Sequence, residues 1–194
     1  MRNTDTGALL LGNLGFKQDA TQSADQATRQ AVFWLNSNST NLNAHIAASG
    51  YYASTKEFAD DGTTAAGVLD ITGSQFPTAM TRQLIDWDGD SCAAYSSSSY
   101  AACIRASDAL TINSNTANYI ILRMCNKPGD YTTDTTVVCV KPMSSSSGGS
   151  TARGELNYSE YARFGSTAQT YFRVLTRIKG QRGTMSYTET IVHF

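Results

Sequence analysis

The chain has 194 residues, a formal net charge of −1 and only 16% charged residues. This length is enough for one domain with a substantial hydrophobic core. The near-neutral charge gives no electrostatic reason to expect nucleic acid or an anionic membrane surface as the main partner. The abundance of Ser, Thr, Asn, Gly and Ala is common in exported proteins with polar, uncharged surfaces.

Residues 5–37 are predicted to form one long helix. Thr4 or Asp5 is the expected N-cap, and the polar run "NSNST" at residues 36–40 ends the helix. Small and apolar residues recur at helical spacing, in the order Leu10, Leu14, Ala20, Ala24, Ala27, Ala31, Trp34 and Leu35. Because this stripe changes from leucine to alanine and then to larger residues, we expect its C-terminal part to pack on a domain. The leucines at the start of the helix are expected to contact a surface that is not part of this domain.

Residues 38–117 show little sustained periodicity and are predicted to be an irregular connecting region with short helices or strands. The segment "TAMTRQLIDW" (residues 78–87) within this region is interpreted as one helical turn or an edge strand.

The acidic loop "DWDGDS" is the only candidate metal site, because Asp86, Asp88 and Asp90 alternate there. Alternating carboxylates on a tight loop can converge on a hard cation such as Ca²⁺. An EF-hand loop requires Gly at its sixth position and Glu at its twelfth, whereas here Gly89 is fourth and Ser97 is twelfth. A solvated acidic turn is therefore the favoured interpretation, with calcium as the weaker one, and no cofactor is predicted.

The four cysteines are Cys92, Cys103, Cys125 and Cys139. None has the C-x-x-C spacing of a zinc or redox site, and neither His45 nor His193 lies near a cysteine in the sequence. Sequential pairing would close two loops of about a dozen residues, each worth about 3 kcal/mol of stability. Disulfides would indicate an oxidising compartment. The alternative is four buried free thiols in a cytosolic protein.

Residues 118–194 are predicted to form an antiparallel sheet. The segments "NYIILRMC" (118–125) and "TTVVCV" (135–140), with a Pro-Gly turn between them, are expected to pair as a hairpin that brings Cys125 near Cys139. A flexible loop is expected over residues 141–155. The segment "TYFRVLTRIKG" then alternates, and a "GQRG" turn leads from it into the last strand. Since no helices separate these strands, an α+β fold is predicted rather than α/β.

No catalytic constellation can be named, so the chain is not predicted to be an enzyme. There is no G-x-S-x-G motif, no nucleophile identifiable beside His45 or His193, and no glycine loop of the phosphate-binding kind.

Three segments, in this order and spacing, resemble PilX-type minor pilins of bacterial type IV pili. The segment "TDTGALLLGNLGFKQDATQSADQATRQAVFWLN", followed by "GYYAS" at residues 50–54, resembles the post-membrane helix of that family. "NYIILRMC" resembles its first sheet strand, and "YFRVLTRIKGQRGTMSYTETIV" resembles its closing hairpin.

The resemblance implies a pilin fold over residues 1–194, in which the long N-terminal helix packs on the antiparallel sheet. It also implies a disulfide-bounded C-terminal region, which Cys125 and Cys139 would supply. The implied function is that of a structural fimbrial subunit, which primes pilus assembly and belongs to the adhesive pilus tip complex. The implied partners are other minor pilins, the major pilin, a large tip adhesin and the inner membrane. The implied location is the periplasmic face of that membrane before assembly and the cell surface afterwards.

Two candidate contact regions follow from the resemblance. The apolar start of the helix would continue into the filament core through Leu9, Leu10, Leu11 and Leu14. In residues 170–180, alternation places Phe172, Val174 and Ile178 on one face, and it places Leu175 and a basic set, Arg173, Arg177 and Lys179, on the other. The simplest interpretation of the basic set is a solvated strand face. Contact with acidic pilus neighbours is the second interpretation, and DNA is an unlikely partner.

The chain also departs from the family. Because no prepilin leader or apolar first helix half precedes Arg2, we expect a soluble fragment of a longer protein. Residues 51–107, with the extra pair Cys92 and Cys103, do not align with the family, so the region 51–117 is a candidate for ligand binding. Two alternatives remain, namely a type II secretion pseudopilin and a secreted adhesive or ligand-binding module.

Overall fold

The structure is a computed structural model, and it describes residues 2–76, 81–141, 170–181 and 183–193, with the backbone alone for residues 2–13. The expected loop at 141–155 therefore lies almost wholly outside the described residues. The helical elements are α1 (Arg2–Ser37) and the short 3-10 helices η1 (Ser39–Asn41), η2 (Ala47–Ser49) and η3 (Ser97–Ser99). The strands are β1 (Tyr51–Tyr52), β2 (Leu69–Asp70), β3 (Gln83–Asp86), β4 (Ala102–Arg105), β5 (Leu110–Ile112), β6 (Asn115–Arg123), β7 (Phe172–Lys179) and β8 (Met185–Val192).

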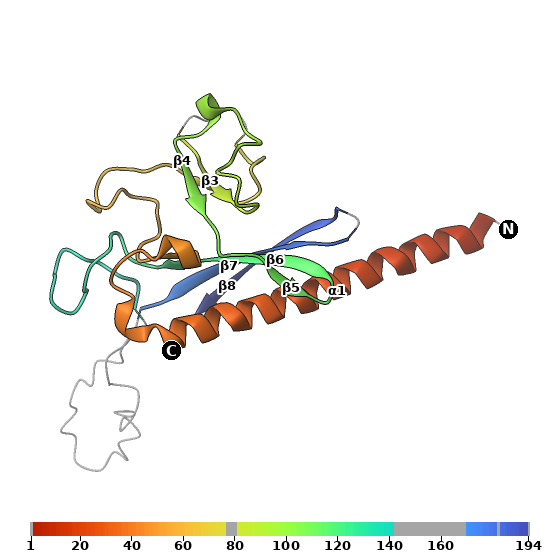
Figure 1. The fold of residues 1–194 in the computed structure, drawn as a ribbon, viewed down its shortest axis with the longest axis horizontal. Coiled ribbons are helices and arrows are strands. Elements are labelled where there is room, and N and C mark those ends of the chain that lie inside the picture. Colours follow the sequence, from red (N-terminus) through yellow and green to blue (C-terminus); the bar gives the residue numbers. More distant parts are fainter. Residues whose placement is uncertain (1, 77–80, 142–169, 182, 194) are drawn as a thin grey trace, which may run out of the picture.

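These elements form three layers, with α1 on one face of a five-stranded main sheet and a smaller sheet on the other face (Figure 1). The main sheet has the order β1-β6-β7-β8, and β5 also pairs with β6. Strands β5, β6, β7 and β8 pair antiparallel, whereas β1 pairs parallel with β6. The small sheet, β2-β3-β4, is parallel throughout. The chain is thus mixed α and β, as predicted, but the main sheet is mixed rather than purely antiparallel.

The predicted helical stripe is confirmed over the part of α1 that lies on the main sheet. Ala27, Ala31 and Leu35 are fully buried, and Ala24 is nearly so. Their short side chains let the helix backbone approach the sheet closely, where they pack against Ile112, Ala117, Tyr119, Ile121, Phe172, Val174 and Ile178. The predicted N-cap at Thr4 or Asp5 is wrong, because the helix already includes Arg2.

The second face of the main sheet is covered by a lobe made of residues 53–109. Ile120 and Leu122 of β6 and Leu175 of β7 pack there against side chains of the lobe, namely Ile85, Trp87, Ile104 and Ala106. Strand β3 is the buried centre of the small sheet and not an edge strand. Parallel strands need long crossovers, which are usually helical. Here the crossover from β3 to β4 is a loop with only the short helix η3. The sequence therefore contains no long helical segment that would indicate a parallel pairing.

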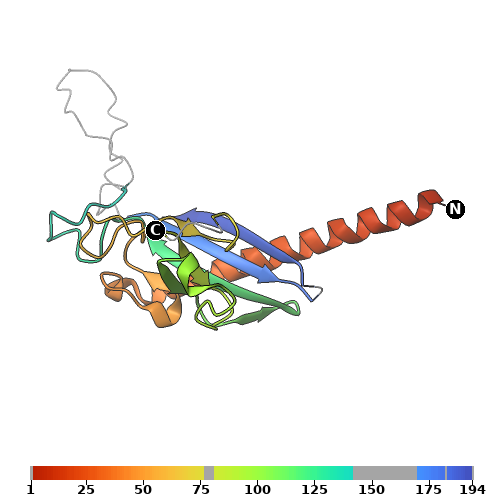
Figure 2. The same cartoon turned by 90° about the horizontal axis from the view of Figure 1, so that it is seen from above.

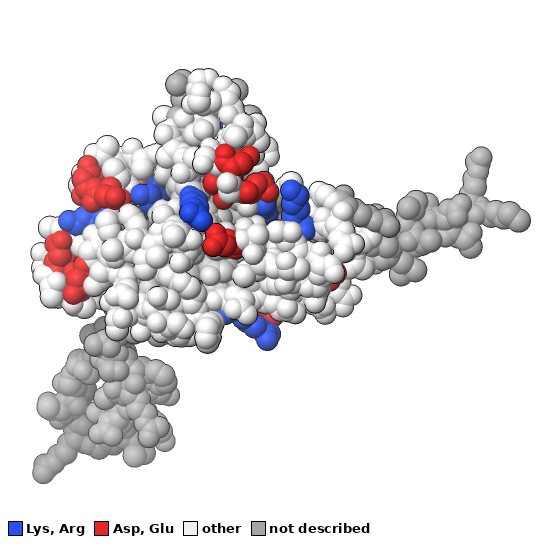
Figure 3. Space-filling model, viewed as in Figure 1, with Lys and Arg blue, Asp and Glu red and all other residues white. Residues whose placement is uncertain are grey.

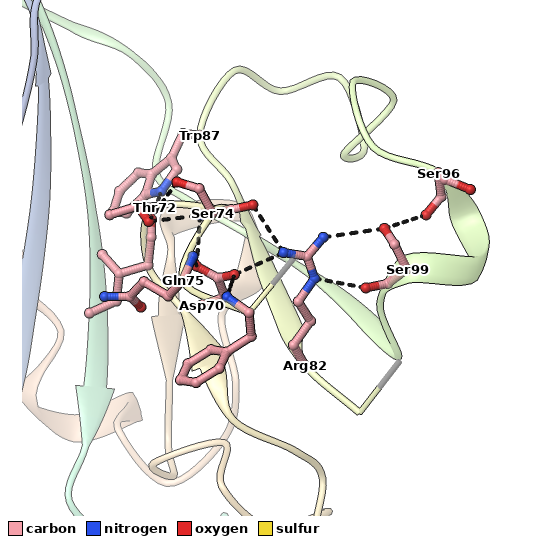
Figure 4. A network of polar contacts seen from close by, with 11 residues as sticks. Asp70, Thr72, Ser74, Gln75, Arg82, Trp87, Ser96 and Ser99 are labelled. Carbon is pink, nitrogen blue, oxygen red and sulfur yellow. Dashed lines mark hydrogen bonds and ion pairs between the residues drawn. The ribbon is translucent and has the colours of Figure 1, made fainter. Parts of the chain in front are cut away.

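A buried ion pair organises the lobe (Figure 4). Arg82 donates from Nη1 to the carboxylate of Asp70 at 2.9 Å and to the carbonyl of Gly73 at 3.0 Å. Its Nε donates to the carbonyl of Ser99 at 2.7 Å. The side chains of Asp70 and Arg82 are 0% and 2% exposed, so this network joins the end of β2 to the segments around Gly73 and Ser99 in a low-dielectric interior.

The predicted hairpin between residues 118–125 and 135–140 is wrong. Residues 135–140 form no strand, and an isolated antiparallel bridge between Cys125 and Cys139 takes the place of a hairpin ladder. The two cysteines are nevertheless close together, as expected, and form a disulfide. Strand β6 pairs instead with β7, in a register that places Arg123 opposite Phe172 and Asn118 opposite Arg177.

Candidate functional site

The N-terminal part of α1 projects away from both sheets (Figures 1 and 2). Its anchorage on the sheet begins where Asn115 of β6 donates to the carboxylate of Asp19 at 2.6 Å and to the hydroxyl of Ser23 at 3.0 Å. Before this point Leu14 is 62% exposed. Of the four leucines expected to contact a filament, the side chains of Leu9, Leu10 and Leu11 lie outside the described residues. In the described part of the chain, no helix has the length and apolarity needed to cross a bilayer.

The three basic residues of β7 do not form a free basic face. Arg173 makes two hydrogen bonds to Glu189 on β8, at 2.8 and 3.1 Å. Arg177 is buried and pairs with Asp88, and Lys179 lies 3.5 Å from the same carboxylate. The expectation that alternation leaves Arg177 in solvent is wrong, because the lobe covers this face of the sheet. On the surface that Figure 3 shows, red and blue side chains lie next to one another, without a large field of one sign.

The carboxylates of the loop "DWDGDS" do not converge on a common point. Asp86 accepts the backbone N–H groups of Asp90 and Ser91, at 3.0 and 2.9 Å. Asp88 turns to Arg177, whose hydrogen bonds hold the pKa of the Asp88 carboxyl below its ordinary value. Within the described ranges, no group of three or more acidic, histidine or cysteine side chains is placed to hold a metal ion. Asp86 and Asp88 therefore act as structural groups in this loop.

The cysteines pair sequentially, as the spacing predicted, and all four are used. Cys92–Cys103 closes the serine-rich loop of the lobe and ties it to β4. Cys125–Cys139 closes the loop that follows β6. The alternative of four free thiols is wrong.

His45 is a structural histidine in this fold. Its Nδ1 accepts the backbone N–H of Ala53 at 2.9 Å, so Nε2 carries the proton and donates to Asp60, also at 2.9 Å. Neither ring nitrogen is free to take a proton from a nucleophile. His193 packs against the ring of Tyr171, with 5.2 Å between the ring centroids.

A cleft of about 400 Å³ lies where the lobe meets the main sheet. Its walls are the end of β3 with the loop that follows it (residues 86–89 and 91), the end of β4 with the segment that follows it (residues 105–109), and Thr116, Asn118 and Arg177 of the main sheet. Sequence reasoning missed Asn118 and Ser107 as lining residues. The available signal was Asn118 itself, a polar residue at the start of the otherwise apolar run "NYIILRMC".

Compared with known protein families, curated proteins and solved structures, the chain matches none of them. The features of the chain that bear on function are the projecting helix, the two disulfides and the cleft between lobe and sheet.

Proposed function

We propose that the chain is a structural subunit of the minor-pilin kind, which enters a type IV pilus through α1 and takes part in priming pilus assembly at the tip. The observation that carries this proposal is the division of α1 into two halves. One half is packed on the sheet by alanines, and the other projects from the domain.

The length of α1 supports an assembly role. At 36 residues it is about 54 Å long, which is more than is needed to cover the main sheet. A projecting helix with an exposed leucine gains stability only when other apolar surfaces cover it, and neighbouring helices of the same type provide such surfaces. We therefore assign Leu14 to a contact with adjacent subunits.

The two disulfides support passage through an oxidising compartment, as a periplasmic and then surface-exposed subunit requires. The partners that fit this role are other minor pilins, the major pilin and a tip adhesin. The absence of a free basic face on β7 removes the sequence argument for DNA as a partner.

Shearing of pili from the bacterium that encodes the chain tests the proposal. The protein is expected in the pilus fraction together with other pilins, and Leu14→Glu is expected to remove it from that fraction without changing its thermal unfolding. Phe33→Glu is the matched control, since Phe33 is exposed on α1 to a similar extent as Leu14 but lies on the packed half. A wild-type protein that never cofractionates with pili or minor pilins would contradict the proposal.

A further inference from the structure

Two buried polar atoms without a hydrogen-bond partner lie at the same place in the molecule. Among the described residues, they are the side-chain oxygen of Asn118 and the Nε of Arg177. Both residues are more than nine-tenths buried, and both line the cleft between the lobe and the main sheet. They are direct partners across β6 and β7. Buried polar groups in proteins are almost always paired. Two unpaired atoms on facing residues of one cleft therefore suggest that the same bound molecule pairs with both.

The surrounding contacts fix the chemical identity of these atoms. Asn118 donates from Nδ2 to the carbonyl of Ser107 at 3.0 Å, so its unpaired atom is the oxygen, an acceptor. Arg177 uses Nη1 and Nη2 on Asp88, and Nη2 also donates to the carbonyl of Trp87 at 2.9 Å. Its unpaired atom is therefore the Nε–H donor, held in a guanidinium that cannot turn away without losing these bonds.

A matching ligand must offer a donor and an acceptor on the same side. A hydroxyl does so with a single oxygen, which donates its hydrogen and accepts through its lone pairs. A peptide group does not, because the N–H and C=O of a trans peptide point in opposite directions. Because both orphan atoms are buried, a hydroxyl reaches them only if the cleft wall at residues 86–89 or 105–109 opens.

The charges around the cleft disfavour an anionic ligand. The guanidinium of Arg177 is neutralised by Asp88, and that of Arg105 is paired with Asp108 at 2.9 Å. No uncompensated cation is left in the wall to attract a phosphate or a carboxylate. The carboxylates of Asp86 and Asp108 add acceptors to the walls, which suits a molecule with several hydroxyl groups.

We propose that this cleft binds a neutral saccharide, with one ring hydroxyl placed between the oxygen of Asn118 and the Nε of Arg177. This binding activity is separate from assembly through α1, because the lobe that walls the cleft and the helix lie on opposite faces of the main sheet (Figure 1).

The test is a titration of the isotope-labelled chain with glucose, galactose, mannose, fucose, N-acetylglucosamine and N-acetylgalactosamine, followed by NMR. At least one sugar is expected to shift the Nε–H signal of Arg177 and the Nδ2 signals of Asn118. This readout uses the unmodified protein, so it does not depend on the folding of a variant. If no sugar shifts these signals, or if shifts occur only elsewhere, the proposal is wrong.

A pair of matched variants then separates binding from stability. Asn118→Leu is expected to lower the affinity for the sugar by at least about tenfold, which is the contribution of one well-placed hydrogen bond. Asn115→Leu removes another buried amide from the same strand, but one that faces α1, and is expected to leave the affinity unchanged. Equal affinity of Asn118→Leu and the wild type would overturn the proposal. So would a crystal structure grown with the sugars in which a water molecule alone bridges the two atoms.

Discussion

Arg177 and Asp88 join the main sheet to the lobe through two parallel hydrogen bonds, of 2.8 and 2.7 Å. Arg177 comes from the middle of the main sheet, whereas Asp88 comes from the loop that follows β3. The arginine is buried and the carboxylate is half exposed, and the guanidinium lies over the ring of Trp87. This pair therefore fixes the position of the lobe on the sheet.

Replacing Asp88 by Asn is expected to lower the free energy of unfolding by about 1–2 kcal/mol. Loss of one partner of a fully buried pair costs about 3–5 kcal/mol, and solvent screening at the half-exposed carboxylate reduces this cost. Urea denaturation measures the change. Glu189→Gln, which breaks the more exposed pair with Arg173, is the control and is expected to cost less than about 1 kcal/mol. Equal costs for both variants would contradict this role of Asp88.

The ion pair of Asp70 is expected to make the lobe sensitive to acid. Burial acts to raise the pKa of Asp70, but the backbone N–H groups of Phe76, Gln75 and Gly73 and the guanidinium of Arg82 outweigh it and hold the pKa below its ordinary value. A lowered pKa in the folded state gives stability that is present above the unfolded pKa of about 3.9 and is lost as the pH falls through the folded value.

The corresponding variant is Asp70→Asn, expected to cost roughly 3 kcal/mol near pH 7 because it leaves Arg82 as an uncompensated buried charge. It is also expected to lose less stability than the wild type between about pH 5 and pH 2. Thermal unfolding across this range measures both effects. If the variant lost as much stability as the wild type over this pH range, other carboxylates and not Asp70 would govern the acid sensitivity.

Removing the disulfide Cys92–Cys103 with a double alanine substitution is expected to cost about 3 kcal/mol. The effect should be confined to the lobe, because the covalent link joins two parts of that lobe. Hydrogen exchange measured by mass spectrometry should show faster exchange in β3 and β4 and unchanged protection in β6 and β7. Loss of protection in β6 would mean that lobe and sheet unfold as one unit.

Enlarging Ala27 to Leu is expected to destabilise the fold by about 1–3 kcal/mol, because a fully buried alanine leaves no space for a larger side chain between α1 and the sheet. Phe33→Ala on the exposed face of the same helix is expected to change stability by less than about 0.5 kcal/mol. Chemical denaturation compares the two, and a neutral Ala27→Leu variant would indicate a loosely packed helix.

The parts of the fold that were predictable from sequence are those with a local signal. The alanine stripe of α1 has the helical period, and the alternation in β7 correctly assigned Phe172, Val174 and Ile178 to one face. The sequential cysteine pairing was also predictable, since each pair closes a short loop.

The burial of Arg177 had no local signal, because its partner Asp88 lies 89 positions earlier, in a loop of the lobe. An alternating basic strand has the same pattern whether solvent or a lobe covers its second face. The parallel strands of the lobe were missed for a related reason. Their crossovers are loops, so neither a helix nor a hairpin turn indicates the pairing of β3 with β4. The cleft lies where these two unpredicted features meet.

Strands β1 and β5 pair with the same edge of β6, at Leu122 for Tyr52 and at Ala117 for Leu110. The lobe therefore leaves and rejoins the main sheet at two points five residues apart along one strand, a span of roughly 17 Å. The lobe is therefore an insertion whose two ends lie close together on one strand of the main sheet. Substitutions in its outer loops do not reach the contacts of α1, because the helix packs on the opposite face of the main sheet. One scaffold, with the same helix packed on its other face, can in this way present many different outer surfaces.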